Sequence, residues 1–262
     1  MTGERDRARV FGEVADEYDR IRPGYPPELV DDVLAYARLD GAPAIEAGAG
    51  TGKATVAFAE RGVAITAIEP DAAMAAVLAH RLADRPDVTV VNSTFEEYAP
   101  DRRYGLLYSA QAWHWTDPAV RWRRAADALA PGGALALFWN SDRPADPDVM
   151  AAIVAAHRRY APRVEFPTEA IDEARLAGEW PGTDLARLPD FGDLSERLYR
   201  WERSLSTADY LSLLSTHSAY RILDGGVRDE LLATLERSLG DRVDLLVDTG
   251  LYLARRALPD QV

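Results

Sequence analysis

The segment Ala44–Gly52 constrains the fold of this chain more than any other part of the sequence. A short apolar run leads into an acidic residue, Glu46, and then into a turn with glycines at positions 48, 50 and 52. Glycine adopts positive φ angles freely and lets a ligand approach the backbone closely. A helix that begins behind such a turn offers unpaired N–H groups and partial positive charge. The segment therefore predicts a strand, a glycine loop and a helix that together bind a ligand.

The details of this loop restrict the kind of ligand. A dinucleotide-binding loop has the pattern G-x-G-x-x-G, and Lys53 stands where its third glycine would be. A P-loop needs a hydroxyl residue after Gly-Lys, and here Ala54 follows instead. A carboxylate at Glu46 would repel a pyrophosphate but would attract an ammonium group. We therefore expect a cationic ligand, and a nicotinamide-dependent oxidoreductase is the less favoured alternative.

Strand and helix patterns alternate five times between Ala44 and Asn140. The apolar strands centre on Ile45, Ile65, Val90, Leu107 and Leu137. This alternation predicts a parallel sheet that is covered by helices on both faces. In such sheets the ligand binds at the carboxyl ends of the strands, where the strand order reverses.

The regions on either side of this core have different patterns. Residues 5–38 carry two apolar stripes at helical spacing, and the segment Arg22–Pro27 separates them. Residues 141–195 hold six prolines and one clear helical piece, Val149–Tyr160. We expect a long irregular connection there, which acts as a lid or covers the sheet edge.

The last part of the chain returns to regular patterns. Residues Leu198–Leu205 and Leu245–Ala254 read as strands. A helix that opens at Ser206–Asp209 and another at about Val227–Leu239 lie between them.

Composition narrows the class of protein. The chain has 262 residues, of which 47% are hydrophobic and 28% charged, as in ordinary globular proteins. It has no cysteine, no apolar run of membrane-spanning length and a charged start without the apolar centre of a secretory signal. A net charge of −13 opposes binding to nucleic acid. We expect a cytoplasmic enzyme that acts on a small molecule without a metal, as a monomer or homodimer.

Three elements in this order resemble the class I S-adenosylmethionine-dependent methyltransferases. The first is the glycine loop with Glu46 before it. The second is Ala64–Asp71, which reads as a strand ending in the acid Glu69, and the third is the Pro-Gly-Gly turn in Leu129–Leu135. The resemblance covers roughly residues 10–140 well and the rest more weakly. Phe11–Pro26 is also similar to the leader of small-molecule methyltransferases related to the trans-aconitate type.

The resemblance implies an α/β fold with a doubly wound, seven-stranded, mainly parallel sheet of the Rossmann-like methyltransferase kind. Its last strand would insert antiparallel. It implies a single methyltransferase domain over residues 1–262, with an N-terminal helical cap at 1–40, a cofactor-binding core at 41–140, a lid insertion after the fifth strand at 141–195, and C-terminal strands and helices at 196–262.

The cofactor that the resemblance implies is S-adenosylmethionine, with S-adenosylhomocysteine as product. Glu46 would accept from its ammonium group and Glu69 from both ribose hydroxyls. Arg22 would hold a carboxylate of the cofactor or substrate, unless it is a surface residue. Ser93 stands where the family often has an acid for the adenine amine, so that contact falls to Ser93 or Glu96. The expected cofactor site comprises Tyr18, Arg22, Glu46, Gly48, Gly50, Thr51, Gly52, Glu69, Pro70, Met74, Ser93, Thr94, Phe95, Glu96, Ser109 and Ala110.

The acceptor site is expected in Ser109–Pro118, because the reactive methyl group lies beside this region in the family fold. Gln111, His114 and Trp115 are the predicted catalytic residues. His114 is a candidate general base because its unperturbed pKa lies near neutrality. Methyl transfer also proceeds by in-line approach without a base, however, and one of the tryptophans at 113 and 115 is expected in the core. His217 is a weaker candidate base.

Oxygen, especially carboxylate oxygen, is the first-choice methyl acceptor by resemblance to the trans-aconitate type. Nitrogen and carbon acceptors stay open. A protein that binds S-adenosylmethionine for regulation or for a reaction other than methylation is the alternative from another class, because binding and acceptor residues are separable.

Overall fold

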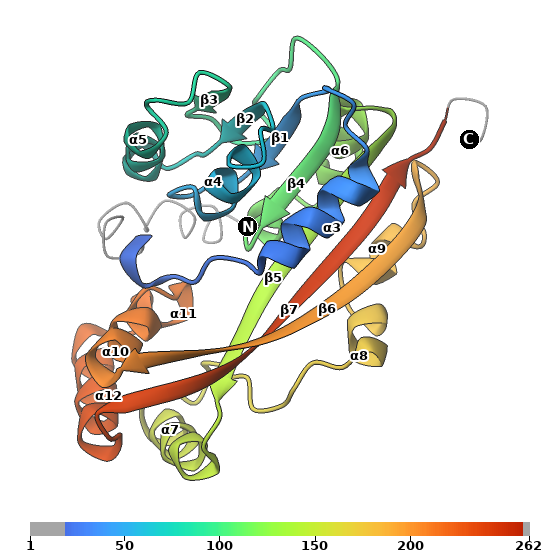
Figure 1. Cartoon of the computed structure of the whole chain (residues 1–262). Helices are drawn as coiled ribbons and strands as arrows, with labels where there is room; N and C mark the ends of the chain where they lie inside the picture. The colour runs from blue at the N-terminus through green and yellow to red at the C-terminus, as the bar shows by residue number, and fades with distance from the viewer. Residues whose placement is uncertain (1–18, 259–262) are drawn as a thin grey trace.

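A computed structural model describes residues 19–258, and seven strands in this range form one sheet. The strand order is β3-β2-β1-β4-β5-β7-β6 (Figure 1). The strands are β1 (Ala44–Ala47), β2 (Ile65–Ile68), β3 (Val88–Val91), β4 (Tyr104–Ala110), β5 (Leu129–Pro144), β6 (Phe191–Ser206) and β7 (Arg242–Arg256).

The first five strands pair in parallel, and β7 lies antiparallel between β5 and β6. The chain builds the sheet outward from β1 to β3 and then starts again at β4 on the other side of β1. The order therefore reverses between β1 and β4, and this is where open α/β sheets bind ligands. The predicted seven-stranded sheet with its antiparallel insertion is confirmed.

Helices cover both faces of the sheet. One face packs against α3 (Pro27–Ala37), α4 (Lys53–Ala59) and α5 (Ala72–Arg81), through buried side chains such as Leu29, Phe58 and Leu78. The other packs against α6 (Arg121–Ala128), α8 (Glu173–Gly178) and α9 (Gly182–Leu185), where Leu176 and Leu185 are buried. The apolar residues of α3 recur at helical spacing, which explains why its buried stripe faces the sheet.

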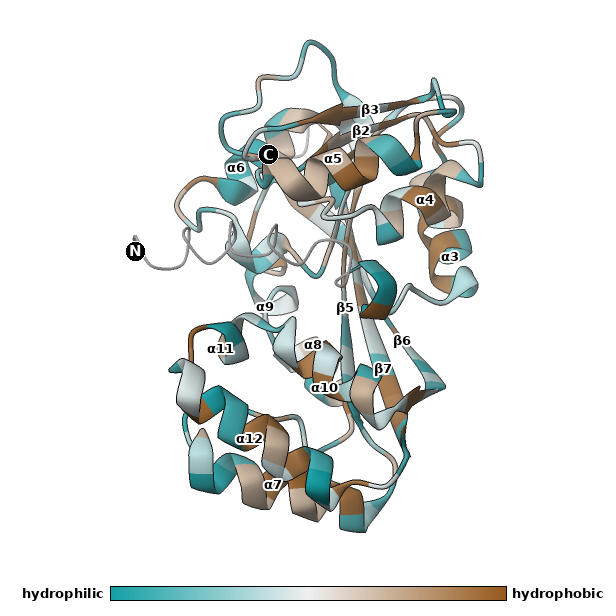
Figure 2. Ribbon diagram, turned by 90° about the vertical axis from the view of Figure 1, so that its left-hand side faces the viewer, coloured by the Kyte–Doolittle hydropathy of each residue, from teal (hydrophilic) through white to brown (hydrophobic). Residues whose placement is uncertain are grey.

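Three strands project beyond the rest of the sheet. β4 ends opposite Phe138, whereas the pairing of β5 with β7 continues to Pro144 and Leu245. The projecting ends of β5, β7 and β6 carry four helices, which we call the distal helices: α7 (Pro147–Tyr160), α10 (Thr207–Ser215), α11 (Ser218–Arg221) and α12 (Gly225–Ser238) (Figure 2). They enclose a separate apolar core that includes Ile153, Leu213 and Leu231.

The prediction of a mostly irregular segment at 141–195 is wrong in part. The helix Val149–Tyr160 is present as α7, which Asp146 caps. However, β5 extends to Pro144, β6 already begins at Phe191, and α8 and α9 lie between them. The first half of β6 escaped prediction because this strand forms the sheet edge, where side chains on both faces are largely solvated and no apolar alternation is required.

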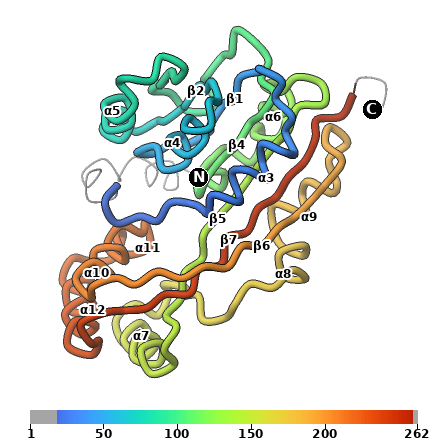
Figure 3. The backbone as a smooth tube through the Cα atoms, viewed as in Figure 1, coloured from blue at the N-terminus to red at the C-terminus, as the bar shows by residue number. Residues whose placement is uncertain are grey.

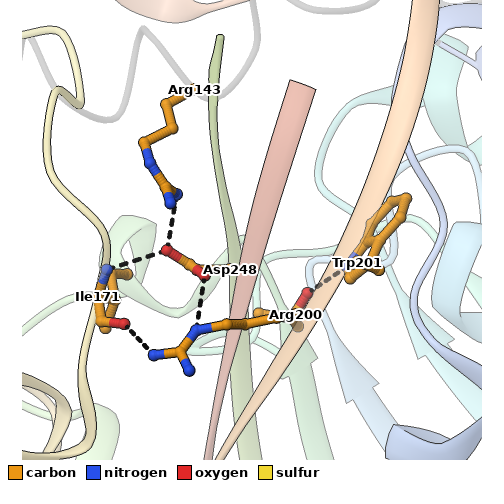
Figure 4. A network of polar contacts seen from close by, with 6 residues as sticks. Arg143, Ile171, Arg200, Trp201 and Asp248 are labelled. Carbon is orange, nitrogen blue, oxygen red and sulfur yellow. Dashed lines mark hydrogen bonds and ion pairs between the residues drawn. The ribbon is translucent and has the colours of Figure 1, made fainter. Parts of the chain in front are cut away.

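The connection from α7 to α8 runs back along the three long strands (Figure 3). A buried carboxylate, that of Asp248 on β7, fixes it there (Figure 4). Its Oδ2 accepts from Arg143 Nη1 and from the Ile171 backbone N–H, each at 2.9 Å. Arg200 on β6 lies 3.4 Å from Oδ1 and donates to the Ile171 carbonyl at 3.0 Å. The network thus joins β5, β6, β7 and the chain before α8.

We expect Asp248→Asn to lower the free energy of unfolding by about 2–3 kcal/mol, because it leaves the largely buried Arg143 guanidinium without its anion. Urea denaturation measures the change. Asp101→Asn is the matched control, since the Asp101–Arg102 pair is mostly exposed and should contribute less than about 0.5 kcal/mol. Equal stability losses in the two variants would contradict a role for Asp248 in fixing the connection.

Candidate functional site

The glycine loop follows β1 and has the positive φ angles that the sequence predicts. Gly48, Gly50 and Gly52 have φ of 73°, 57° and 94°. The Gly48 and Ala49 N–H groups both donate to the Ile68 carbonyl at the end of β2, at 2.9 Å. A Cβ atom on Gly48 would lie 2.4 Å from Ala112 Cβ, whereas one on Gly50 would meet no atom within 4 Å. The loop is therefore tightly packed at Gly48 and open at Gly50.

Glu46 lies buried beneath this loop. Its Oε2 accepts hydrogen bonds from Thr55 Oγ1 at 2.6 Å and from the Tyr108 hydroxyl at 2.9 Å. Burial raises the pKa of Glu46 to about 8, although both hydrogen bonds act to lower it. Both of these donors are neutral hydroxyls, so the carboxyl group is held by groups that bring no compensating positive charge. A ligand that supplies a cation would favour its ionised form.

Glu69 is the acid at the end of β2, and it ties the loop to this strand. Its Oε2 accepts from the Gly50 N–H at 2.7 Å, and its Oε1 accepts from the Asp71 N–H at 2.8 Å. Burial raises the pKa of Glu69 to about 7, against the effect of these two backbone donors. A carboxylate has about four acceptor positions, so Glu69 retains the capacity to bind ligand hydroxyls.

A cavity of about 640 Å³ opens over the glycine loop at the carboxyl ends of β1, β2 and β4. The predicted site residues that line it are Arg22, Glu46, Gly48, Gly50, Thr51, Glu69, Pro70, Met74, Thr94, Phe95, Glu96, Ala110, Gln111, His114 and Trp115. The fold therefore brings residues that are more than ninety positions apart, such as Arg22 and Trp115, to the same cavity.

Three predicted residues do not line this cavity, and a fourth lies outside the described residues. Ser109 is fully buried and donates to the Ala47 carbonyl at 2.7 Å, which joins β4 to β1. The Ser93 hydroxyl donates to the Thr94 carbonyl at 3.0 Å. Gly52 caps α4, and its α-carbon faces Leu78 of α5. Tyr18 precedes the first described residue.

Sequence reasoning missed several lining residues. Six of them lie next to predicted positions: Ala49, Lys53, Ala54, Glu97, Ala112 and Thr116. They could have been predicted, because ligands bind at the carboxyl ends of the strands and the chain that follows each strand lies there. Asn140 lies on β5 and could have been found in the same way. The sequence gives no indication of the other four lining residues, because they do not follow strands of the predicted core. Two precede α3, Pro23 and Tyr25, and two come from the distal helices, His217 and Ser218. The sequence predicts His217 only as a weaker candidate base.

Residues 19–26, which we call the leader, run from the distal helices to α3 (Figure 1). Arg22, Pro23 and Tyr25 of this segment line the cavity. Arg22 donates from Nε to Thr216 Oγ1 at 2.9 Å and from Nη2 to the Thr216 carbonyl at 3.1 Å. The Gly24 carbonyl accepts from Asn140 Nδ2 at 3.1 Å. The leader is thereby held at two points, one on the distal helices and one on β5, and Arg22 is not a free surface residue.

The predicted lid, residues 141–195, does not reach the wall of this cavity. Only residues 141–142 and 165–167 of this range line a second, smaller cavity beside it. The chain near Ile171 is instead attached to the sheet through Asp248. This arrangement agrees with the alternative that the segment covers the sheet edge, and movement as a lid stays a prediction.

The wall after β4 contains the aromatic cluster. Trp113, His114 and Trp115 form a 3₁₀ turn, η2 (Trp113–Trp115). Trp113 is fully buried, and its ring centroid lies 5.5 Å from that of Phe95 and 5.4 Å from that of Trp122. It is therefore the tryptophan of this turn that belongs to the core. His114 and Trp115 face the cavity instead.

The His114 ring is held in one tautomer. Its Nδ1 lies 3.3 Å from Trp139 Nε1. An indole N–H can only donate, so Nδ1 accepts and the proton of the neutral ring lies on Nε2. The His114 side chain is exposed at the cavity wall, and desolvation by the surrounding protein together with the charge of Arg121 lowers its pKa to about 4. His114 is therefore neutral at pH 7, with a donor at Nε2 and an occupied lone pair at Nδ1.

Gln111 has an unusual backbone. Its φ is 61°, in the left-handed region that residues other than glycine rarely adopt. Its backbone N–H donates to Phe138 and its Nε2 donates to the Asn140 carbonyl at 3.1 Å, and both contacts are on β5. Strain of this kind, at about 1–3 kcal/mol, commonly occurs at functional sites.

Two negative findings apply to residues 19–258. No group of three or more His, Cys, Asp or Glu side chains is placed to hold a metal ion. No helix in this range is long and apolar enough to cross a membrane.

Comparison with known proteins shows similarity to methyltransferases. Residues 44–133 match the family model described as a methyltransferase domain. An uncharacterized methyltransferase of Mycobacterium tuberculosis is 39% identical over 138 residues, which are 52% of this chain and 54% of that protein. The chain thus spans about half the length of the curated relatives that it matches first.

Solved structures agree in fold. A protein from Anaeromyxobacter dehalogenans, described as a type II methyltransferase, superposes with a TM-score of 0.63 at 24% sequence identity. The superposition covers 91% of this chain and 99% of that protein. A methyltransferase from Geobacter sulfurreducens, in complex with S-adenosylhomocysteine, superposes with a TM-score of 0.54 at 18% sequence identity. The superposition covers 94% of this chain and 97% of that protein. Residues 44–133 therefore match a methyltransferase domain, in a chain that has the Rossmann-like methyltransferase fold.

Proposed function

We propose that this protein transfers the methyl group of S-adenosylmethionine to a small-molecule acceptor by in-line displacement. The observation that carries the proposal is the buried carboxyl group of Glu46, which lies below an open glycine loop and receives hydrogen bonds from neutral hydroxyls. S-adenosylmethionine brings an ammonium group and a sulfonium, and it would supply the charge that this site lacks. The complex of the Geobacter protein with S-adenosylhomocysteine supports the same ligand class.

The remaining cofactor contacts follow from the lining residues. The Gly50 and Asp71 N–H groups occupy one acceptor position on each Glu69 carboxylate oxygen. The remaining acceptor positions would receive hydrogen bonds from the two ribose hydroxyls. Pro70 and Met74 would flank the adenine. Of the two candidates for the adenine amine, Glu96 lines the cavity and Ser93 does not, so we assign this contact to Glu96. The Glu96 carboxylate already accepts from the Asp117 N–H, which fixes its orientation.

The acceptor would lie against Gln111, His114 and Trp115, beyond the methyl group. Neutral His114 offers a hydrogen-bond donor, and Arg22 brings positive charge to the same cavity. Both suit an acceptor with an anionic oxygen, such as a carboxylate of the trans-aconitate type. A carboxylate is already ionised at pH 7 and needs no base, so positioning supplies the catalysis. The Trp115 ring would attract the sulfonium.

The alternatives differ in specific residues. A nitrogen acceptor would need a group that removes its proton, and His114 with an occupied lone pair is poorly suited to this task. A protein that binds S-adenosylmethionine without methylating would need the cofactor contacts but not the wall formed by Gln111, His114 and Trp115. Turnover with a range of small carboxylic acids distinguishes these functions.

The first test is cofactor affinity. We expect Glu46→Gln and Glu69→Gln each to weaken S-adenosylmethionine binding by about 1.5–3 kcal/mol, because each removes hydrogen bonds to a charged group. Calorimetric titration measures the affinity, and circular dichroism checks that folding is retained. Glu60→Gln, at the exposed end of α4, is the matched control. Wild-type affinity in both site variants would refute the cofactor assignment.

The raised pKa of Glu46 predicts a pH-dependent difference in stability. The folded state of the free protein holds the Glu46 proton up to about pH 8, whereas the unfolded state loses it near pH 4.5. Ionisation of the unfolded chain therefore lowers stability progressively as pH rises through this window. Glutamine does not titrate, so we expect the melting temperature of Glu46→Gln to rise relative to the wild type from pH 5 to pH 8. A difference that stays constant with pH would exclude the buried, protonated state of Glu46.

The role of His114 is tested through the rate. If His114 is a neutral donor, His114→Asn should lower kcat/KM by less than about 10²-fold and should leave the shape of the pH–rate profile between pH 6 and 8 unchanged. Trp139→Phe should have a similar but smaller effect, because it removes the N–H that selects the tautomer. His80→Asn, on the exposed side of α5, is the control. A larger loss together with a missing ionisation would instead identify His114 as a general base.

A further inference from the structure

A second cavity of about 140 Å³ lies beside the large one. The walls of the two cavities share Asn140 and His217, so these two side chains stand between them. The small cavity is bounded by the projecting end of β5 at Asp142, by the connection after α7 at Phe166, and by the distal helices at Tyr210. None of the contacts assigned to the cofactor lies in it. It therefore extends the site on the side of the acceptor.

Tyr210 supplies the first indication of a ligand. The side chain is 2% exposed, and within the described residues its buried hydroxyl has no hydrogen-bond partner. The neighbouring Tyr220 hydroxyl differs, because it is hydrogen-bonded to His157 Nε2 at 2.5 Å. A buried hydroxyl without a partner costs about 1–3 kcal/mol, so native structures rarely leave one unless a ligand or water completes it.

Asp142 supplies the second indication. Burial raises the pKa of its carboxyl group, while the charges of Arg22 and Arg203 lower it. No other described residue donates a hydrogen bond to this carboxyl group through its side chain. Asp142 and Tyr210 line the same cavity. The cavity thus offers a carboxyl acceptor and a phenol hydroxyl to the same ligand.

The charges around Asp142 favour a neutral ligand. Arg22 and Arg203 already compensate the carboxylate of Asp142, so this group is a weak partner for a ligand cation. A ligand anion would meet the carboxylates of Asp142 and Glu165 in the same wall. His217 is neutral, because burial and the charge of Arg22 lower its pKa. Phe166 and Leu213 provide apolar surface for a carbon skeleton.

We propose that the small cavity is a subsite for the end of the acceptor remote from the methyl group, and that it binds a neutral hydroxyl on a small apolar skeleton, such as a phenol. The ligand hydroxyl would donate to Asp142 and accept from Tyr210. This inference rests on the proposed methyltransferase function, and it narrows the acceptor to molecules with a hydroxyl at the end opposite the methylated atom.

The test uses phenol as the probe and compares it with benzoate and benzylammonium, which have similar skeletons and opposite charges. Ligand-observed NMR titration of the full chain measures the three affinities. Because the large cavity offers Arg22 to benzoate and Glu46 to benzylammonium, the three ligands are compared by the affinity that each loses in the variants, and we expect this loss for phenol and not for either ion. Tyr210→Phe and Asp142→Ala should each weaken phenol binding by about tenfold, which corresponds to one hydrogen bond of roughly 1.4 kcal/mol. Tyr160→Phe, a partly exposed tyrosine on α7, should bind phenol as the wild type does.

Calorimetry with S-adenosylhomocysteine on the same samples separates this proposal from the proposed function. Tyr210→Phe removes one oxygen atom, so it should fold and keep wild-type affinity for S-adenosylhomocysteine. Failure of the wild type to bind S-adenosylhomocysteine would refute the methyltransferase function, whatever phenol does. Absence of phenol binding, unchanged phenol affinity in both variants, or an equal loss of affinity for either ion in these variants would overturn the subsite.

Discussion

The two hydrogen bonds that Glu69 accepts, from Gly50 and from Asp71, are the contact on which the site depends. The bond from Gly50 holds the glycine loop after β1 against the end of β2, two segments about twenty residues apart in the chain. The bond from Asp71, two residues further on, fixes the Glu69 carboxyl group in place. The loop then covers Glu46, and this burial raises the pKa of the Glu46 carboxyl group to about 8. One acid therefore shapes the loop, and the loop in turn determines the electrostatic state of the other acid.

The far side of the site depends on the three long strands. Because β5, β7 and β6 continue past the end of β4, the distal helices stand opposite the glycine loop (Figure 2). Arg22 attaches the leader to these helices, and Asn140 attaches it to β5. Asp248 holds the connection before α8 on the same strands. The acceptor side is thus built from segments that meet only because these strands project.

The cavity combines buried acids with neutral histidines. Glu46 and Glu69 have raised pKa values, whereas His114 and His217 have lowered ones, and burial is the largest cause in all four cases. The free site is therefore less charged at pH 7 than its residue types suggest. A cationic cofactor would find carboxyl groups ready to ionise without competing cations from the histidines. The histidines then act through hydrogen bonds, as the contact between His114 and Trp139 indicates.

Much of the cofactor half could be predicted from the sequence by itself. Positive φ at Gly48, Gly50 and Gly52, acids at the ends of β1 and β2, and the seven-stranded sheet all follow from local patterns and strand alternation. Local contacts decide these features, so local sequence reports them. Other features depend on partners distant in the chain: the Ser109 side chain turns to the Ala47 carbonyl, and Trp139 fixes the His114 tautomer. Only the tertiary structure decided that Tyr210, His217 and Asp142 share a cavity, because the pairing of β5 with β7 places them there, and no spacing in the sequence encodes that pairing.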